Sequence, residues 1–303
     1  MKILFTALYD WANVCNRITR ALNANGEVVA RVATMYKHPL GYAEDKGSPE
    51  ELLAWTPQVD WLISGGDASY DFFNQLRSAF PFRRDVRLAT MHVGSAYRNS
   101  PDALNIADAR AGFQKRFIGH DLYRLAHRDP RAVAYFAPAD TVLDQLPSLA
   151  GRPVICHSPT HHVTKGTEKL LPILQSFKDH ADIDIIEGVG FAECARRRAA
   201  AHIFVDQMCP EIRGFGASAI EALAAGCVVL ADYSNSIPAV WDFFPKPPII
   251  QVGTPEELRE RIAQLVDDPT LLLVMRQMSL KWAQENTAAG PLAAWWLKHL
   301  EAL

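Results

Sequence analysis

Residues 213–230 read RGFGASAIEALAAGCVVL, a stretch in which two glycines, a helical pattern and an apolar strand follow one another. Gly214 and Gly216 indicate a loop whose backbone N–H groups can approach a ligand closely. The positive N-terminal end of the following helix favours an anion such as a phosphate. Glu221 lies about one turn into that helix, and Gly226 ends it before the strand. The stretch therefore predicts a loop, helix and strand belonging to an α/β sheet with a ligand at the helix tip.

The same alternation extends to both sides of this stretch, since short apolar runs and longer amphipathic runs follow one another along the whole chain. This pattern is typical of parallel sheets with crossover helices. Strands are expected at Lys2–Thr6, Glu27–Ala33, Asp60–Ser64, Val86–Met91, Lys115–Ile118, Val154–His157, Ile183–Glu187, Ile203–Asp206, Val228–Ala231 and Ile249–Val252. Helices are expected at Trp11–Leu22, Ala68–Ala79, Pro101–Ala107, Thr167–Ser176, Ala192–Ala200, Ala217–Ala225, Glu256–Val266, Thr270–Glu285 and Pro291–Ala302. The segment Tyr36–Ser48 reads as a loop.

The length of 303 residues predicts two domains. A break falls at residues 146–153, LPSLAGRP, where proline, serine and glycine collect. We therefore expect a Rossmann-like domain over 1–148, a second over 149–285, and a last helix over 286–303 that packs at the domain junction. Thr254 and Glu257 predict a capping box at the start of the Glu256–Val266 helix.

Composition excludes several classes of protein. A net charge of -3 gives no global attraction to nucleic acid or to anionic membranes. The five cysteines are scattered without a C-x-x-C pair, which suits a reducing compartment. No stretch approaches the roughly 20 apolar residues that cross a bilayer, and the apolar start of the chain is interrupted at Asp10. These features predict a cytoplasmic protein with no integral membrane segment.

A second motif occupies residues 157–167, HSPTHHVTKGT, directly after a predicted strand and before a predicted helix. A phosphate-binding loop belongs at that position. Lys165 offers a positive charge to a diphosphate, and Gly166 permits the turn into the helix. The adjacent His161 and His162 would point in opposite directions and have no third ligand at a suitable spacing, so they predict loop residues and no metal site.

These two stretches resemble the donor-binding motifs of GT-B glycosyltransferases of the family 4 kind, E-x7-E followed by E-A-x-A-x-G-x-P-V, and a K-G element. In that family the second glutamate holds the ribose of the nucleotide, and Glu221 matches it. Arg213 stands at the position of the first glutamate, and Glu211 lies two residues further back. Thr160 stands where many members carry an arginine.

The resemblance implies the GT-B fold, in which two Rossmann-like domains with parallel sheets face each other across a cleft. It also implies a nucleotide-sugar donor, with a UDP-sugar favoured over a GDP-sugar, and neither a cofactor nor a metal. Arg213 is expected to supply charge at the reacting centre. The donor-binding residues that the resemblance implies are Lys165, Gly166, Thr160, Asp206, Gln207, Gly214, Phe215, Gly216 and Glu221, where Asp206 and Gln207 match a D-Q pair of the same branch. Asp206 could equally cap the loop that follows it.

The first half of the chain carries weaker signals. Asp10 and Asn13 follow the first strand, where GT-B enzymes place an acceptor-facing loop. Residues 91–98, MHVGSAYR, resemble the H-G-S-x-x-R loop of related glycosyltransferases and contribute His92, Ser95 and Arg98. Histidine suits a general base or a hydrogen bond to a donor hydroxyl, although a packed histidine fits the pattern too.

The acceptor stays open: a carbohydrate, a lipid-linked molecule or a small molecule is favoured over a modified base in DNA. Retention of the anomeric configuration is what the family implies, but the arginine at position 213 leaves the stereochemistry open. An epimerase-type enzyme of the same architecture and a binding protein without turnover also fit the sequence. Trp295 and Trp296 either pack the last helix or contact a membrane surface.

Overall fold

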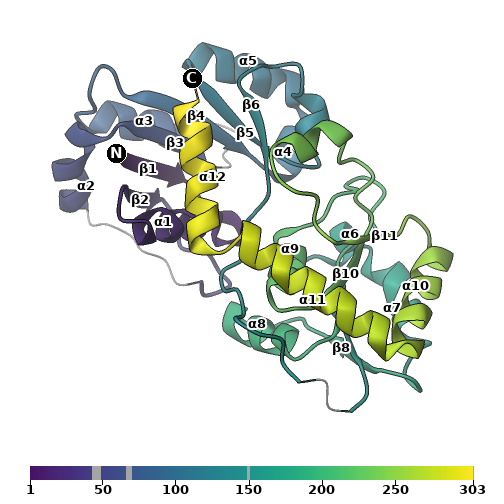
Figure 1. Ribbon diagram of the computed structural model, residues 1–303. Helices are drawn as coiled ribbons and strands as arrows, with labels where there is room; N and C mark the ends of the chain where they lie inside the picture. Colours follow the sequence, from purple (N-terminus) through teal and green to yellow (C-terminus); the bar gives the residue numbers. More distant parts are fainter. Residues whose placement is uncertain (43–48, 66–69, 149–150, 303) are drawn as a thin grey trace. The chain divides into compact units, whose positions relative to one another are not determined.

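The structure is a computed structural model, and it describes residues 1–42, 49–65, 70–148 and 151–302. The chain divides into two compact units, of which the first comprises Met1–Phe136 with Ala289–Leu303 and the second Ala137–Ala288. The first unit thus ends before residue 148, and the last helix groups with the first unit. Figure 1 shows both units, with most of their helices and strands labelled.

The first unit is built on a six-stranded sheet in the order β2-β1-β3-β4-β5-β6. All its neighbouring strands pair in parallel, with Lys2 opposite Val29 at the start of the β1–β2 ladder. The strands are β1 (Lys2–Ala7), β2 (Val29–Thr34), β3 (Trp61–Gly65), β4 (Arg87–His92), β5 (Lys115–Gly119) and β6 (Ala132–Tyr135). The expected strands of this half are confirmed, whereas β6 was not expected from the sequence.

Helices connect the strands of the first unit, and the last helix of the chain also belongs to this unit. They are α1 (Val14–Ala24), α2 (Pro49–Trp55), α3 (Asp71–Ala79), α4 (Gly94–Asn99), α5 (Pro101–Ala111) and α12 (Ala289–Glu301), with short 3-10 turns η1 (Trp11–Asn13), η2 (Thr56–Gln58) and η3 (Tyr123–Leu125). The start of the helix expected at Ala68–Ala79 and residues 43–48 of the expected loop lie outside the described residues.

The last helix, α12, packs on the first unit beside α1 (Figure 1). Trp296 is 1% exposed, and its ring centroid lies 4.2 Å from that of Phe117 and 5.9 Å from that of Phe5. Trp295 lies 6.2 Å from the Phe117 ring. Both tryptophans therefore pack onto the core of the first unit.

The second unit contains a five-stranded sheet in the order β11-β10-β9-β7-β8, again with parallel neighbours. Its strands are β7 (Val154–His157), β8 (Asp182–Ile185), β9 (Ile203–Val205), β10 (Val228–Ala231) and β11 (Ile250–Gln251). Its helices are α6 (His162–Lys165), α7 (Thr167–Gln175), α8 (Phe191–Ala199), α9 (Ala217–Ala224), α10 (Pro255–Asp267) and α11 (Pro269–Asn286), with the 3-10 turn η4 (Pro238–Asp242). The apolar faces of β7, β9 and β10 meet α7, α10 and α11 in one buried core.

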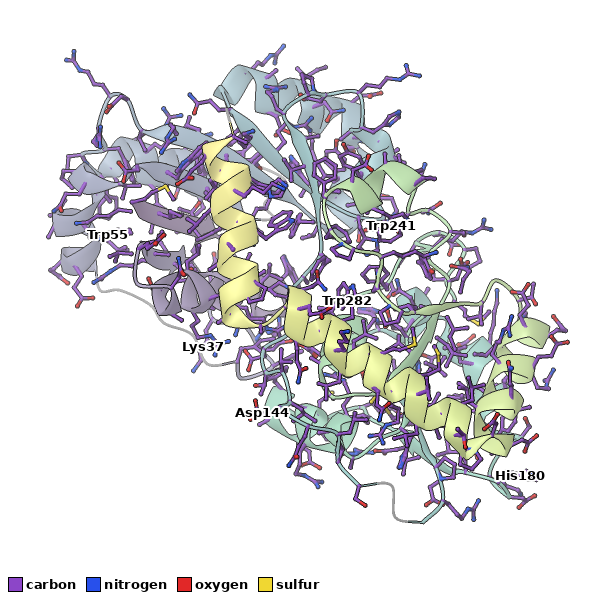
Figure 2. The ribbon with its side chains drawn as sticks, viewed as in Figure 1. Lys37, Trp55, Asp144, His180, Trp241 and Trp282 are labelled. Atoms are coloured by element: carbon purple, nitrogen blue, oxygen red, sulfur yellow. The ribbon has the colours of Figure 1, made fainter. Side chains whose placement is uncertain are left out.

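Two local details of the second unit fix helix positions. Thr254 caps α10, since its Oγ1 accepts the N–H of Glu257 at 3.2 Å, as expected. The Glu257 carboxylate, however, accepts the N–H of Gly253 and not that of Thr254, so the reciprocal bond of the expected capping box falls one residue earlier. On α11, the indole of Trp282, labelled in Figure 2, donates to the carbonyl of Pro245 at 2.9 Å.

Candidate functional site

Lys165 is the last residue of α6, a single helical turn that Gly166 ends in the left-handed conformation, at φ 68°. Its ammonium binds the carboxylate of Asp206 and lies 3.1 Å from Ser218 Oγ. The lysine side chain is 11% exposed and the aspartate side chain 0%. A side chain that the sequence placed at a phosphate site is therefore held in a buried ion pair.

Asp206 follows directly after β9, at the carboxyl end of the sheet, where parallel α/β sheets bind their ligands. One carboxylate oxygen accepts the N–H of Gly216 at 2.7 Å, and the other contacts Ser218 Oγ at 3.1 Å. Burial opposes ionisation of Asp206, but the charge of Lys165 and the hydrogen bond from Gly216 hold its pKa below the usual value. An ionised carboxylate therefore caps the loop before α9, in line with the capping role considered from the sequence.

Gly216 gives the lysine room to reach this carboxylate. A Cβ atom at this position would stand 3.1 Å from Lys165 Nζ and 3.6 Å from Asp206 Oδ2. Its φ of -91° suits any residue, so a side chain at this position would meet crowding at the lysine ammonium and no backbone strain.

The start of α9 presents backbone donors. In the described part of the chain, the N–H groups of Ala217 and Ser218 form no hydrogen bond, while that of Gly216 goes to Asp206. Unpaired N–H groups at a helix N-terminus, together with the helix dipole, favour an anion. This is the feature of the second unit best suited to a phosphate.

The remaining loop residues shape the surroundings of this helix tip. Gln207 is buried and its amide nitrogen donates to the carbonyl of Gly214. The ring of Phe215 lies 6.0 Å from that of Tyr233, which in turn lies 6.3 Å from Trp241, labelled in Figure 2. The expected donor residues Gln207, Gly214 and Phe215 thus fix the loop from inside the unit.

Arg213 has a φ of 46°, a left-handed conformation that is uncommon outside glycine. Its side chain is half exposed, and its Nε lies 3.8 Å from the carboxylate of Asp232, which follows β10. Each of the two cations expected at the donor site, Lys165 and Arg213, therefore faces an aspartate, and their formal charges cancel. Attraction of a diphosphate then rests on the helix tip and on geometry more than on net charge.

Glu221 forms an ion pair with Arg198 of α8, and the two side chains are 10% and 4% exposed. Arg198 also donates to Cys194 Sγ at 3.1 Å and lies over the Phe204 ring. A glutamate expected to hold ribose hydroxyls is thus oriented by a buried arginine that the sequence did not reveal. Its contact with a ribose stays a prediction.

The other expected donor residues lie apart from this cluster. Thr160 is exposed in the loop before α6. Glu211, which could replace the first glutamate only if the loop were rearranged, accepts from Cys209 Sγ at 2.9 Å.

In the first unit, His92 ends β4 and is 3% exposed. Its Nε2 lies 2.8 Å from Asp108 Oδ2 and 3.3 Å from the hydroxyl of Tyr70. The ring rests against Tyr97, with centroids 4.5 Å apart. His92 therefore belongs to a buried polar network, which agrees with the packed histidine considered from the sequence.

Asp108, from α5, is the centre of this network. It also binds Arg116 Nε at 2.6 Å, and Arg116 binds Asp129 at 2.8 Å. Burial opposes ionisation of Asp108, but the hydrogen bonds from His92 and Tyr70 and the charge of Arg116 hold its pKa below the usual value. Because an ionised carboxylate only accepts hydrogen bonds, His92 Nε2 carries the proton of this contact.

Asp10, expected to face an acceptor, is 1% exposed. Its two carboxylate oxygens accept the N–H groups of Cys15 and Asn16, each at 2.8 Å, which caps α1. Asn13 is buried in the left-handed conformation at φ 56°. Burial, only partly offset by these hydrogen bonds, raises the pKa of Asp10. The contacts of Asp10 are therefore those of a structural residue.

Residues 94–98, expected as a loop, belong to the helix α4, on which Ser95 is exposed and Arg98 binds the carboxylate of Asp121 at 2.6 Å. His92, at the strand end, is buried, whereas Ser95 is on the surface, although only two residues separate them. An acceptor contact of Ser95 or Arg98 stays a prediction.

Among the described residues, no group of three or more histidine, cysteine, aspartate or glutamate side chains is arranged to hold a metal ion. In the same part of the chain, none of the helices combines the length and the apolar character that a bilayer crossing needs.

Sequence comparisons match no family model and no curated protein. Solved structures, by contrast, match over nearly the whole chain. HepE from Anabaena, solved with UDP, aligns with a TM-score of 0.65 at 12% identity and covers 100% of both chains. Sucrose-phosphate synthase from Thermosynechococcus elongatus gives a TM-score of 0.60 at 14% identity over 98% of each chain. MnaA from S. aureus, solved with UDP, gives 0.55 at 13% identity over 99% of this chain and 96% of its own. The two parallel sheets and these full-length matches show that the chain has the GT-B fold found in glycosyltransferases.

Proposed function

We propose that the protein transfers a sugar from a nucleotide-sugar donor, with a UDP-sugar favoured over a GDP-sugar, to an acceptor held by the first unit. The observation that carries this proposal is the N-terminus of α9, where the N–H groups of Ala217 and Ser218 stand beside Lys165 at the carboxyl edge of the sheet. This arrangement fits a diphosphate. Two proteins of the same fold, HepE and MnaA, were solved with UDP, which favours uridine as the base.

Sugar transfer requires charge to be neutralised on a departing nucleoside diphosphate. Donors already in position can do this without reorganisation during the reaction. Asp206 holds both Lys165 and the loop before α9, so the lysine and the helix tip form one preorganised unit. Arg213 is half exposed and lies 3.8 Å from Asp232, and we expect it to turn from this aspartate to the phosphates when the donor binds.

Thermal-shift measurements with UDP, GDP, ADP and CMP test the donor site first. A nucleotide that binds only the folded state at about 100 times its Kd adds about 2.7 kcal/mol to the free energy of unfolding. UDP is expected to give the largest shift. If none of the four nucleotides stabilises the protein, the donor site proposed at α9 is wrong.

Variants then test which residues bind the nucleotide. Arg213→Ala should weaken UDP binding more than twofold in isothermal titration calorimetry, whereas Lys169→Ala, an exposed lysine on α7, should leave it unchanged. An unchanged Kd for Arg213→Ala would remove the arginine from the site. Product analysis with the UDP-sugar alone separates transfer from an epimerase-type reaction, because an epimerase needs no acceptor.

A further inference from the structure

Three aromatic side chains gather where β1 and β2 end, and we call Tyr9, Trp11 and Tyr36 the aromatic surface. Trp11 is 56% exposed and Tyr36 50% exposed. The Tyr9 ring stacks on that of Tyr36 at 5.1 Å and 28°, and lies 5.7 Å from that of Trp11. The three rings of the aromatic surface thus contact one another, and two of them, Trp11 and Tyr36, are exposed to solvent.

The backbone fixes the two tyrosines beside each other. The β1–β2 pairing continues past the strands, since the N–H of Met35 donates to Ala7 at 3.1 Å and that of Tyr36 to Leu8 at 2.9 Å. Tyr36 therefore lies next to Tyr9 by strand register. Because the rings are already held in place, less conformational entropy is lost when a ligand binds to them.

Trp11 is held by a strained turn. Ala12 and Asn13, which follow it, have φ of 52° and 56°. Asp10 secures the turn, because its carbonyl accepts the N–H of Asn13 at 2.9 Å while its carboxylate caps α1. Non-glycine residues in this conformation cost free energy and gather at ligand sites. The strained turn thus directly follows an indole that is exposed to solvent.

Core packing does not account for these rings, since an aromatic side chain gains stability by burial. The rings lie at the carboxyl ends of β1 and β2, and parallel α/β sheets bind their ligands at the carboxyl ends of their strands. Their position therefore indicates a ligand site. Neither Tyr9 nor Tyr36 was expected from the sequence to belong to a site, and the polar residues expected there, Asp10 and Asn13, are buried.

The chemistry of the rings selects the class of ligand. Within the described residues, the hydroxyls of Tyr9 and Tyr36 and the indole N–H of Trp11 form no hydrogen bond. A matching ligand has an apolar face edged by hydroxyl groups, which describes a pyranose ring. A lipid chain would cover these polar groups without pairing them. A nucleic acid would need a row of cations for its phosphates. Lys37, next to Tyr36, is an exposed cation, whereas Arg17 is 3% exposed.

We infer that the aromatic surface is a saccharide-binding subsite, in which a pyranose ring stacks on Trp11 and Tyr36 and exchanges hydrogen bonds with the tyrosine hydroxyls. The role of this subsite as the acceptor site rests on the proposed sugar transfer. Its occupant is a neutral carbohydrate, and the acceptor of the reaction is therefore a glycan or a molecule that carries one.

The test is binding of the full-length protein to an array of neutral glycans, followed by titration calorimetry with the best of them. Trp11→Ala and Tyr36→Ala should each weaken this binding by about threefold to tenfold, the range expected for one aromatic contact. Ile106→Ala is the matched control, since Ile106 is 54% exposed on α5 and outside the aromatic surface. Thermal unfolding of each variant checks that the fold is retained.

The subsite is overturned if no neutral glycan on the array binds, or if binding to the best glycan is equal in the wild type, Trp11→Ala and Tyr36→Ala. Vesicles of phosphatidylglycerol and a duplex DNA are run in parallel, and loss of vesicle or DNA binding in Trp11→Ala without glycan binding also overturns it. UDP titration of the same variants separates the two proposals. Glycan binding without binding of UDP, GDP, ADP or CMP would refute sugar transfer and keep the saccharide subsite. Binding of one of these nucleotides without glycan binding would refute the subsite and keep the donor site.

Discussion

The ammonium of Lys165 and the carboxylate of Asp206 form an ion pair in which the side chains are 11% and 0% exposed. The pair joins the loop after β7 to the strand end of β9 and, through Gly216, to the start of α9. Two charges taken out of water are tolerated only when they are paired and hydrogen-bonded. The same pair that positions a cation near the helix tip therefore also contributes to holding the second unit together.

Lys165→Met should lower the free energy of unfolding by about 2–3 kcal/mol, because it leaves the Asp206 carboxylate buried without its cation. Urea denaturation followed by circular dichroism measures the loss. The control is Lys169→Met, which removes an exposed lysine and should change stability by less than about 0.5 kcal/mol. Asp206→Asn in the Lys165→Met background should recover part of the loss. Equal stability of the two lysine variants would show that the pair is not energetically important.

Gly166→Ala should be clearly more destabilising than Gly112→Ala, although both glycines are left-handed, at φ 68° and 77°. A Cβ at position 166 would stand 2.6 Å from the carbonyl oxygen of Met208, whereas one at position 112 meets nothing within 4 Å. The left-handed backbone alone costs about 1–2 kcal/mol. The clash with a backbone carbonyl should add at least about 1 kcal/mol, measured as the difference between the two denaturation midpoints. Equal losses would mean that the loop moves to admit the methyl group.

Much of the sheet could be predicted, because its strands are apolar runs bounded by turn residues. The strand β6 (Ala132–Tyr135) carried a signal that the prediction missed, because residues 132–137, AVAYFA, form a short apolar run between Arg131 and Pro138. Residues 48–51, SPEE, are a start signal for the helix α2. The prediction missed this helix because it followed the alternation of apolar runs and did not use the start signal. Element boundaries elsewhere followed from glycine, proline and capping residues.

The candidate site was only partly predictable. Lys165, Asp206 and Gly216 do meet, because strand ends and helix starts gather at one edge of a parallel sheet. The partners of the other residues could not be read from local patterns. Arg198 lies 23 residues from Glu221, and Asp108 lies 16 residues from His92 on a different element. Such pairings depend on tertiary packing, which no spacing rule encodes.

Asp108→Asn should change the hydrogen bond that His92 Nε2 makes to residue 108, because asparagine offers no carboxylate to accept it. In the wild type, Nε2 donates to the Asp108 carboxylate, so NMR of ¹⁵N-labelled histidine should find the proton on Nε2. The asparagine also leaves buried Arg116 with Asp129 as its carboxylate, which should lower the free energy of unfolding by about 2–3 kcal/mol. Asp102→Asn, an exposed aspartate of the same helix, is the control and should alter neither quantity. If His92 Nε2 carries no proton in the wild type, the hydrogen bond that we assign from His92 to Asp108 is wrong.

His202 gives the second unit a pH-dependent stability. It is 7% exposed, and its Nδ1 accepts the N–H of Val154 at 3.0 Å. Burial, assisted by the charge of Arg276, lowers the pKa of His202 from 6.5 to about 4. Above pH 6.5 the histidine is neutral in both the folded and the unfolded chain, so its contribution is fully present. As the pH falls from 6.5 towards 4, the unfolded chain binds a proton that the folded chain does not, and stability is lost.

The loss at His202 is isolated by comparing the wild type with His202→Asn, whose side-chain oxygen can accept the N–H of Val154 in place of Nδ1 but does not titrate. Between pH 7 and pH 4.5 the free energy of unfolding of the wild type should fall by about 2 kcal/mol more than that of the variant. Urea denaturation at half-unit pH intervals gives both curves. Parallel curves would mean that His202 binds its proton equally well in the folded and unfolded chains. Its burial against Val154 and Arg276 would then not govern its titration.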